Sequence, residues 1–172
     1  MAAPVRHKCF ITFHQADKEY VDRFVTRFDD VMIPRVLGVS DLDDFIDSDD
    51  SDYVMRRIRE KYITDSTVTI MLTGTCTWAR KYVDWEIASS LRNDPNNKRN
   101  GLLGIKLSYM PAGSTTVPER FHDNTQMGYA FFRSYPDTSE QLRGWIEKAL
   151  DLRDTVTADN SRPLRKRNGT CP

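Results

Sequence analysis

The sequence predicts an α/β domain of the flavodoxin-like, doubly wound kind, with a mostly parallel five-stranded sheet and helices on both faces. Three observations support this fold class. Segments with strand and helix patterns alternate along the chain of 172 residues. Residues 67–72 form a continuous apolar and β-branched run, typical of a parallel strand that is buried on both faces. A helix pattern follows at residues 79–91, as expected for parallel strands joined by crossover helices.

The first half of the chain contains two further strand patterns and two further helix patterns. The first strand is expected at residues 8–14, an apolar run that ends in a polar loop. Asp17 can then cap a helix that carries aromatic side chains at helical spacing. A short second strand is expected at residues 35–39. The next helix is expected to begin with Ser51 or Asp52 as its cap.

The second half continues the alternation. A fourth strand is expected at residues 102–107, and residues 111–127 are expected to be irregular because they begin with Pro-Ala-Gly. The last strand is expected at residues 129–132. Residues 139–153 have apolar side chains spaced for one face and are expected to form the closing helix.

The chain is expected to form one domain, residues 1–154, followed by a basic tail, residues 155–172. One domain suits a length of 172 residues. The tail contains four cations within its last dozen residues and lacks an apolar pattern. The sequence therefore predicts a solvated, disordered end, with a weak contact to an anion as the alternative.

Composition argues against several classes of partner. The formal net charge is zero, so the sequence does not predict a nucleic-acid partner. No apolar run reaches the ~18 residues that span a bilayer, so no membrane partner is expected. Cys9, Cys76 and Cys171 show neither a C-x-x-C pattern nor zinc-ligand spacing, so no metal site is expected. Without a secretory signal pattern at its start, the chain is expected to be cytoplasmic.

Glu86 is the most informative candidate for chemistry. It lies on the expected helix at 79–91, one step from the face formed by Val83 and Ile87. That position places it at the rim of the sheet, near the carboxyl ends of the strands, where ligands bind in open α/β sheets. An ordinary half-exposed helix glutamate is the alternative. The functional interpretation is a partly desolvated carboxylate that holds a ribose or acts as a general base.

Several aromatic residues and one histidine are further candidates for the site. Trp78 and Trp85 have helical spacing, which is typical of packing but also suits stacking on a flat ring. Tyr82 lies on the same ridge as Trp78. Phe10 and His14 lie at the end of the first strand, so His14 and Glu86 are predicted to line one crevice. A simple loop histidine is the alternative for His14.

Several common motifs are missing. Residues 41–52 contain seven aspartates, but neither possible start gives the EF-hand spacing, so a solvated loop and a helix cap are expected there. The chain has no P-loop, no G-x-G-x-x-G and no G-x-S-x-G. A response-regulator receiver domain would need acidic residues after the first strand and an Asp at the end of the third. The sequence has His14-Gln15-Ala16 and Thr73-Gly74 at those places.

The chain resembles the TIR-domain superfamily, and within it the compact TIR-like proteins of bacterial Thoeris anti-phage defence systems. Residues 10–14, followed by Asp17, are similar to the opening strand of the family. Residues 67–74 are similar to its third strand. Residues 77–87 resemble the motif in which an aromatic pair precedes the catalytic glutamate. The resemblance covers about residues 8–92 well, and beyond Gly101 it rests on the order of elements.

The resemblance implies a hydrolase-type enzyme, an NAD⁺ nucleosidase or ADP-ribosyl cyclase, with NAD⁺ as substrate and no separate cofactor. Such an enzyme would release a cyclic ADP-ribose isomer as a second messenger, which reaches a separate effector protein. Glu86 would be the catalytic residue. Self-assembly or a phage-derived trigger would activate the enzyme.

The substrate-binding residues implied by this resemblance come from three parts of the chain. They are Phe10, His14, Asp47, Ser48, Trp78, Tyr82 and Trp85. Arg80 and Lys81 are candidates for contacts with the pyrophosphate. Two other functions remain open, a TIR-like adaptor that acts through protein contacts and a sensor that binds a nucleotide without turning it over. Whether Glu86 faces an open pocket or a packed surface distinguishes the enzyme from the adaptor.

Overall fold

A computed structural model of the chain describes residues 3–36, 50–95 and 98–172. The described residues form a single five-stranded parallel sheet with the order β2-β1-β3-β4-β5. The strands are β1 (His7–Thr12), β2 (Met32–Val36), β3 (Val68–Thr73), β4 (Gly101–Lys106) and β5 (Ala130–Arg133). All four pairings between neighbouring strands are parallel. This is the flavodoxin-like strand order, so the predicted fold class is confirmed.

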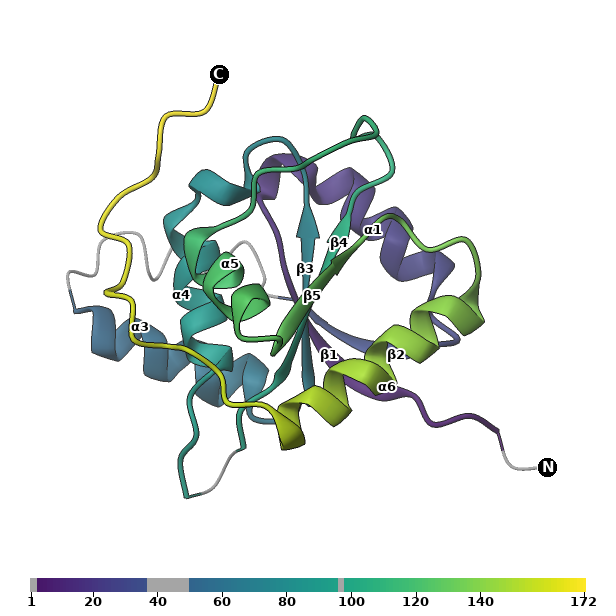
Figure 1. Ribbon diagram of the computed structural model, residues 1–172, viewed down its shortest axis with the longest axis horizontal. Helices are drawn as coiled ribbons and strands as arrows, with labels where there is room; N and C mark the ends of the chain where they lie inside the picture. The colour runs from purple at the N-terminus through teal and green to yellow at the C-terminus, as the bar shows by residue number, and fades with distance from the viewer. Residues whose placement is uncertain (1–2, 37–49, 96–97) are drawn as a thin grey trace.

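Helices cover both faces of the sheet. They are α1 (Lys18–Arg27), α3 (Ser51–Ile58), α4 (Lys81–Ser90), α5 (Glu119–Gln126) and α6 (Ser139–Thr155). In Figure 1, α3, α4 and α5 lie on one side of the sheet, and α1 and α6 lie on the other. In the described parts of the chain, none of the helices combines the length and hydrophobicity that a bilayer span requires.

The pleat of β1 divides its side chains between the two layers. Cys9 and Ile11 join the core beneath α1 and α6, which includes Phe24 and Leu142. Phe10 points to the opposite face and packs with residues of α3 and α4. Because side chains alternate along a strand, Thr12 shares the face of Phe10 and lies beneath α4. The strand therefore presents a polar group to α4 at its carboxyl end.

Three boundaries differ from those expected. β2 begins earlier than residue 35 and contains Pro34, which is tolerated because β2 is an edge strand that pairs only with β1 in the described sheet. The cap of α3 is Asp50, whose side chain accepts a hydrogen bond from the amide of Tyr53 at 3.1 Å. Residues 111–127 are not wholly irregular, because α5 begins directly after Pro118.

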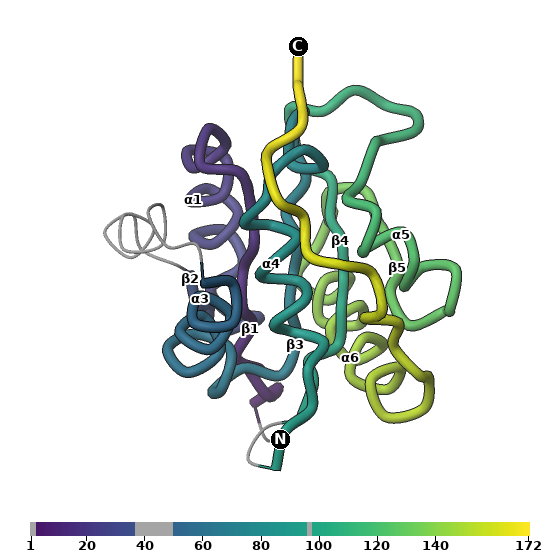
Figure 2. The backbone as a smooth tube through the Cα atoms, turned by 90° about the vertical axis from the view of Figure 1, so that its left-hand side faces the viewer, coloured from purple at the N-terminus to yellow at the C-terminus, as the bar shows by residue number. Residues whose placement is uncertain are grey.

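The C-terminal residues differ most from the expectation. Residues 156–172, here called the C-terminal strap, run as an ordered extended segment over α5 and α4 toward the carboxyl edge of the sheet, as the yellow trace in Figure 2 shows. The sequence predicted a disordered tail from its charge. Instead, Arg162 pairs with Asp123 and Glu119 of α5, and Asn124 bonds to the backbone of Asp159. These partners are distant in sequence, so they were not visible as a pattern.

The strap ends in a disulfide between Cys76 and Cys171. Cys76 lies between β3 and α4, and the two cysteines are 95 residues apart in the sequence. Cys9 is a buried free thiol in β1, and burial raises the pKa of this thiol to about 12. No spacing pattern in the sequence predicted this pairing.

Candidate functional site

The candidate site lies where the carboxyl ends of β1 and β3 meet. In this strand order the chain leaves β1 toward β2 on one side and returns to β3 on the other, so β1 and β3 flank the topological switch point. Thr12 pairs with Met71 near this edge, and β3 ends at Thr73. Crevices at such points are where ligands bind in open parallel sheets. The helix α4 begins eight residues after β3 and covers this position.

Glu86 projects from α4 into this layer and is 5% exposed. Its neighbours Val83 and Ile87 pack with the sheet, and Trp85 packs with α3. Burial raises the pKa of the Glu86 carboxyl to about 8, and the Thr12 hydroxyl acts in the opposite direction by favouring the ionised form. The alternative of an ordinary half-exposed glutamate does not hold. Glu86 is a buried carboxyl whose protonation changes near neutral pH.

His14 lies at the same edge of the sheet, just after β1. Partial burial lowers the pKa of His14, the charge of Arg80 lowers it further, and Asp17 acts in the opposite direction. Arg80 directly precedes α4, so the loop after β1 and the start of α4 are close enough for their charges to interact. These shifts favour a neutral imidazole at pH 7. A neutral imidazole can accept a proton or a hydrogen bond.

A polar network beside His14 joins three loops at this edge. The hydroxyl of Tyr109 donates to Asp17 Oδ1 at 2.7 Å, and the amide of Thr75 donates to the same hydroxyl at 3.0 Å. A Cβ atom on Gly74 would lie 2.2 Å from both Asp17 Oδ2 and the Tyr109 oxygen, so only glycine fits there. The sequence pattern predicted Asp17 as a helix cap, but its side chain makes no capping hydrogen bond to α1 and joins this network instead. Nothing in the local pattern links Tyr109 to Asp17, which is 92 residues away.

The aromatic candidates divide into two groups. Phe10 is fully buried and Trp85 nearly so, and both belong to the core between the sheet and α3. In this conformation Phe10 has no surface to offer a ligand. Tyr82 and Trp78 are partly exposed, and Tyr82 meets Trp85 edge to face with centroids 5.7 Å apart. The structure thus favours packing for Phe10 and Trp85 and leaves Trp78 and Tyr82 accessible.

The remaining candidates lie elsewhere. Asp47 and Ser48 lie outside the described residues. Lys81 lies at the start of α4, where its ammonium sits over the rings of Tyr82 and Trp85 at 5.0 and 5.1 Å. Lys81 is therefore beside the aromatic residues that flank Glu86, on the outer side of α4.

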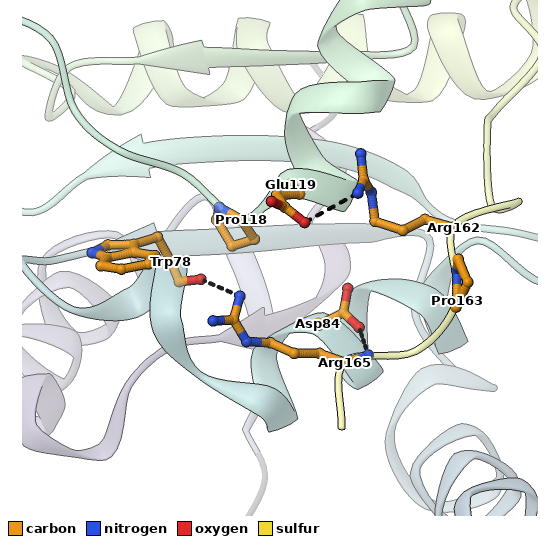
Figure 3. Close-up of a pocket in the computed structure, with 7 residues that line it drawn as sticks. All are labelled: Trp78, Asp84, Pro118, Glu119, Arg162, Pro163 and Arg165. Carbon is orange, nitrogen blue, oxygen red and sulfur yellow. Dashed lines mark hydrogen bonds and ion pairs between the residues drawn. The ribbon is translucent and has the colours of Figure 1, made fainter. Parts of the chain in front are cut away.

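A small cavity lies between α4, α5 and the strap (Figure 3). Its lining includes Trp78 and Asp84, and Arg165 spans it by donating to the carbonyl oxygen of Trp78 at 3.4 Å. Glu86 is not among its lining residues. Its volume of about 180 Å³ is below the roughly 300 Å³ at which small-molecule sites begin, so it cannot hold a dinucleotide.

The family model for the TIR-like domain of the Thoeris protein ThsB matches residues 10–111, more than half of the chain. The chain belongs to this family. It is thus a TIR protein of Thoeris anti-phage defence, as the sequence resemblance predicted. The matched TIR-like region runs from β1 to the residues after β4 and contains His14 and Glu86. A search of curated proteins finds no match to the chain.

The TIR-like region contains both sides of the switch point, whereas α5, β5, α6 and the strap lie beyond it. TIR-like domains of this family often cleave NAD⁺, and the Thoeris context points to effector proteins as partners. The residues that build the Glu86 environment therefore belong to the part of the chain that defines the family. The strap lies outside it, and the disulfide joins Cys171 of the strap to Cys76 inside it.

Proposed function

We propose that this TIR-like protein cleaves NAD⁺ and releases a cyclic ADP-ribose-type second messenger that activates a separate effector. The observation that supports this proposal is the buried carboxyl of Glu86, which lies at the switch point of the sheet and inside the family-matched region. Its raised pKa suits a group that must hold or accept a proton during a reaction.

The reaction breaks the bond between C1′ of the ribose and the nicotinamide nitrogen. The electron pair of that bond leaves with nicotinamide, and positive charge develops on the ribose as in glycoside cleavage. An ionised Glu86 stabilises this charge, because opposite charges attract strongly in a water-poor site. A hydroxyl or ring nitrogen of the same ADP-ribose then bonds to C1′ to close the ring. When a hydroxyl attacks, Glu86 accepts its proton.

Cyclisation requires that water does not reach C1′ first. Trp78 lies just before α4, and Tyr82 and Trp85 belong to α4, so aromatic side chains lie near Glu86 on the segment that carries it. Aromatic walls exclude water from the reacting centre. His14, held neutral by burial and by Arg80, is a second group at the same edge that can bind a ribose hydroxyl.

An adaptor without chemistry is the second candidate function, and one observation favours it. Glu86 is covered in this structure, whereas an active enzyme must admit its substrate to the carboxylate. Under the enzyme proposal, the segments over Glu86 move apart before NAD⁺ binds. Under the adaptor alternative, Glu86 stays packed and helps only to position α4.

Product analysis separates these functions. Concentrated protein is incubated with NAD⁺, with and without lysate from infected cells, and the products are identified by mass spectrometry. The proposal predicts loss of NAD⁺ and a product with the mass of cyclic ADP-ribose. Linear ADP-ribose as the only product would indicate a hydrolase and not a cyclase. Intact NAD⁺ in every condition, with folded protein, would favour the adaptor, and thermal stabilisation by NAD⁺ without product would indicate a sensor.

A further inference from the structure

The strap contacts the connection between β3 and α4 through several backbone groups. The amide of Gly169 donates to the carbonyl of Ala79 at 2.7 Å, and the amide of Lys81 donates to the Asn168 side chain at 2.8 Å. The disulfide joins Cys171 to Cys76 in the same connection. The end of the strap is thus fixed to residues 76–81, which lead directly into the helix that carries Glu86.

The middle of the strap covers the outer side of α4. The indole N–H of Trp85 donates to the carbonyl of Arg165 at 2.7 Å, and the amide of Arg165 donates to Asp84 at 2.8 Å. Leu164 packs against the cluster that contains Phe10, Tyr82 and Trp85. The strap is therefore hydrogen-bonded to Trp85, which directly precedes Glu86 in the sequence, and to Asp84, two residues before Glu86. While the strap is in place, α4 and its N-terminal connection cannot shift without breaking these contacts.

The two ends of the strap are held by different means. Near residues 159–163, it is anchored by the buried side chains of Arg120 and Asn124. Near residues 168–171, it is held by the hydrogen bonds of Asn168 and Gly169 to residues 79–81 and by the disulfide. Both Cys76 and Cys171 are partly exposed, so a thiol reagent can reach the sulfur atoms, whereas Cys9 is buried.

We propose that Cys76 and Cys171 form a redox modification site that holds the end of the strap against residues 76–81, the connection that leads into the helix carrying Glu86. In the disulfide state, the end of the strap fixes residues 76–81 and keeps Glu86 buried. In the dithiol state, this end is released and the connection before α4 becomes free to move.

The chemistry is thiol–disulfide exchange with a cellular dithiol. One thiolate of that dithiol attacks Cys76 or Cys171, the S–S bond between the two cysteines breaks, and a mixed disulfide forms. The second thiolate of the dithiol then displaces the protein sulfur. The protein gains two electrons and two protons as two thiols, and the reductant becomes a disulfide. The reverse exchange with a low-molecular-weight disulfide such as oxidised glutathione closes the strap again.

The first test is structural and does not depend on any activity. Full-length protein is treated with oxidised glutathione or with dithiothreitol, and peptides are mapped by mass spectrometry without further reduction. We expect a linked peptide pair that contains Cys76 and Cys171 after oxidation, with Cys9 unmodified. Failure to form that linked pair would overturn the proposal.

Hydrogen exchange then measures whether the strap opens. Reduction is expected to increase amide exchange at least tenfold at Ala79–Lys81 and at Gly169. Cys171→Ser should exchange like the reduced protein and should not respond to dithiothreitol. Thr170→Ser leaves both sulfur atoms in place and should behave like the unmodified chain. Equal exchange in the oxidised and reduced protein would overturn the proposal.

The consequence for catalysis rests on the proposed NAD⁺ function and is measured in a separate assay of NAD⁺ cleavage. If NAD⁺ is cleaved, the reduced protein and Cys171→Ser should cleave it at least tenfold faster than the oxidised protein. A change in exchange without any NAD⁺ cleavage would leave the strap site standing and contradict the enzyme function. Equal cleavage in both redox states, with unchanged exchange, would contradict the strap site and leave the enzyme function standing.

Discussion

Arg120 of α5 and Asp84 of α4 form a buried, two-point ion pair, with Nε 2.8 Å from Oδ1 and Nη2 3.3 Å from Oδ2. Arg120 is 1% exposed and Asp84 is 5% exposed. The other donor groups of the guanidinium reach the strap, at the side chain of Asn160 and the carbonyl of Pro163. This pair therefore joins α4, α5 and the strap two residues before Glu86.

Arg120→Ala should destabilise the fold strongly, because it leaves the Asp84 carboxylate buried without its cation. Removing one partner of a buried ion pair lowers the free energy of unfolding by about 3–5 kcal/mol. Urea denaturation measures this change. Arg162→Ala is the matched control, since Arg162 pairs with Glu119 and Asp123 at the surface and should cost about 1 kcal/mol or less. Similar losses of unfolding free energy in both variants would show that the buried Arg120 pair contributes no more to stability than a surface pair.

Because the pKa of Glu86 is raised in the folded protein, the fold should become less stable as the pH rises. Below about pH 4.5 the carboxyl is protonated in both states, so its shift contributes its full stabilisation there. Between about 4.5 and about 8, the folded protein keeps a proton that the unfolded chain has released. The free energy of unfolding therefore falls with pH across this window and levels off above it.

Glu86→Gln removes this titration and should stabilise the protein at high pH. We expect a gain of about 2–4 kcal/mol in the free energy of unfolding at pH 8, with little gain at pH 4.5. Urea denaturation at several pH values checks both the size and the slope. A variant with the same pH slope as the unmodified protein would show that Glu86 is ionised when folded.

The rate of NAD⁺ cleavage should depend on pH in the opposite way. If an ionised Glu86 stabilises the transition state, kcat/KM should rise with pH through about 8 and level off above it, because this ratio reports the pKa of the free enzyme. Initial rates of nicotinamide release between pH 6 and 9 give this profile. A profile that falls over this range would assign the essential ionised group to another residue.

Gly74→Ala should disturb the edge of the sheet. The added methyl group would overlap Asp17 Oδ2 and the Tyr109 hydroxyl oxygen, so the hydrogen bond between Asp17 and Tyr109 must shift. We expect a loss of about 1–3 kcal/mol in the free energy of unfolding. Gly144→Ala in α6 is the control, because a Cβ there meets no atom within 4 Å and alanine favours helix by about 0.5–1 kcal/mol. Thermal unfolding of both variants tests the difference.

The sheet and the position of Glu86 follow from local sequence patterns. The β-branched run before Gly74 fixes β3, and apolar spacing around Val83 and Ile87 fixes the face of α4. The strand order then places Glu86 near the switch point, and TIR-like family membership agrees with that placement. How deeply Glu86 is buried was not predictable, because burial depends on what packs over α4.

The strap and the polar edge required contacts that no local pattern reveals. The carboxylates that pair with Arg162 lie 39 and 43 residues away in the sequence, and Cys76 lies 95 residues from Cys171. The C-terminal end is basic, contains glycine and lacks apolar periodicity, so its sequence predicted a solvated segment. The space beside Gly74 is likewise decided by Asp17 and Tyr109, which come from two other loops.

The most direct test of the central claim is the rate of nicotinamide release from NAD⁺ by Glu86→Gln. The unmodified protein, Glu86→Gln and Glu119→Gln are compared at equal, high concentration after reduction. Glu119 is the control, since it lies on α5 and pairs with Arg162 at the surface. The account predicts release by the unmodified protein and by Glu119→Gln, and none above background by a folded Glu86→Gln. Equal release by Glu86→Gln would contradict the assignment of Glu86 as the catalytic residue.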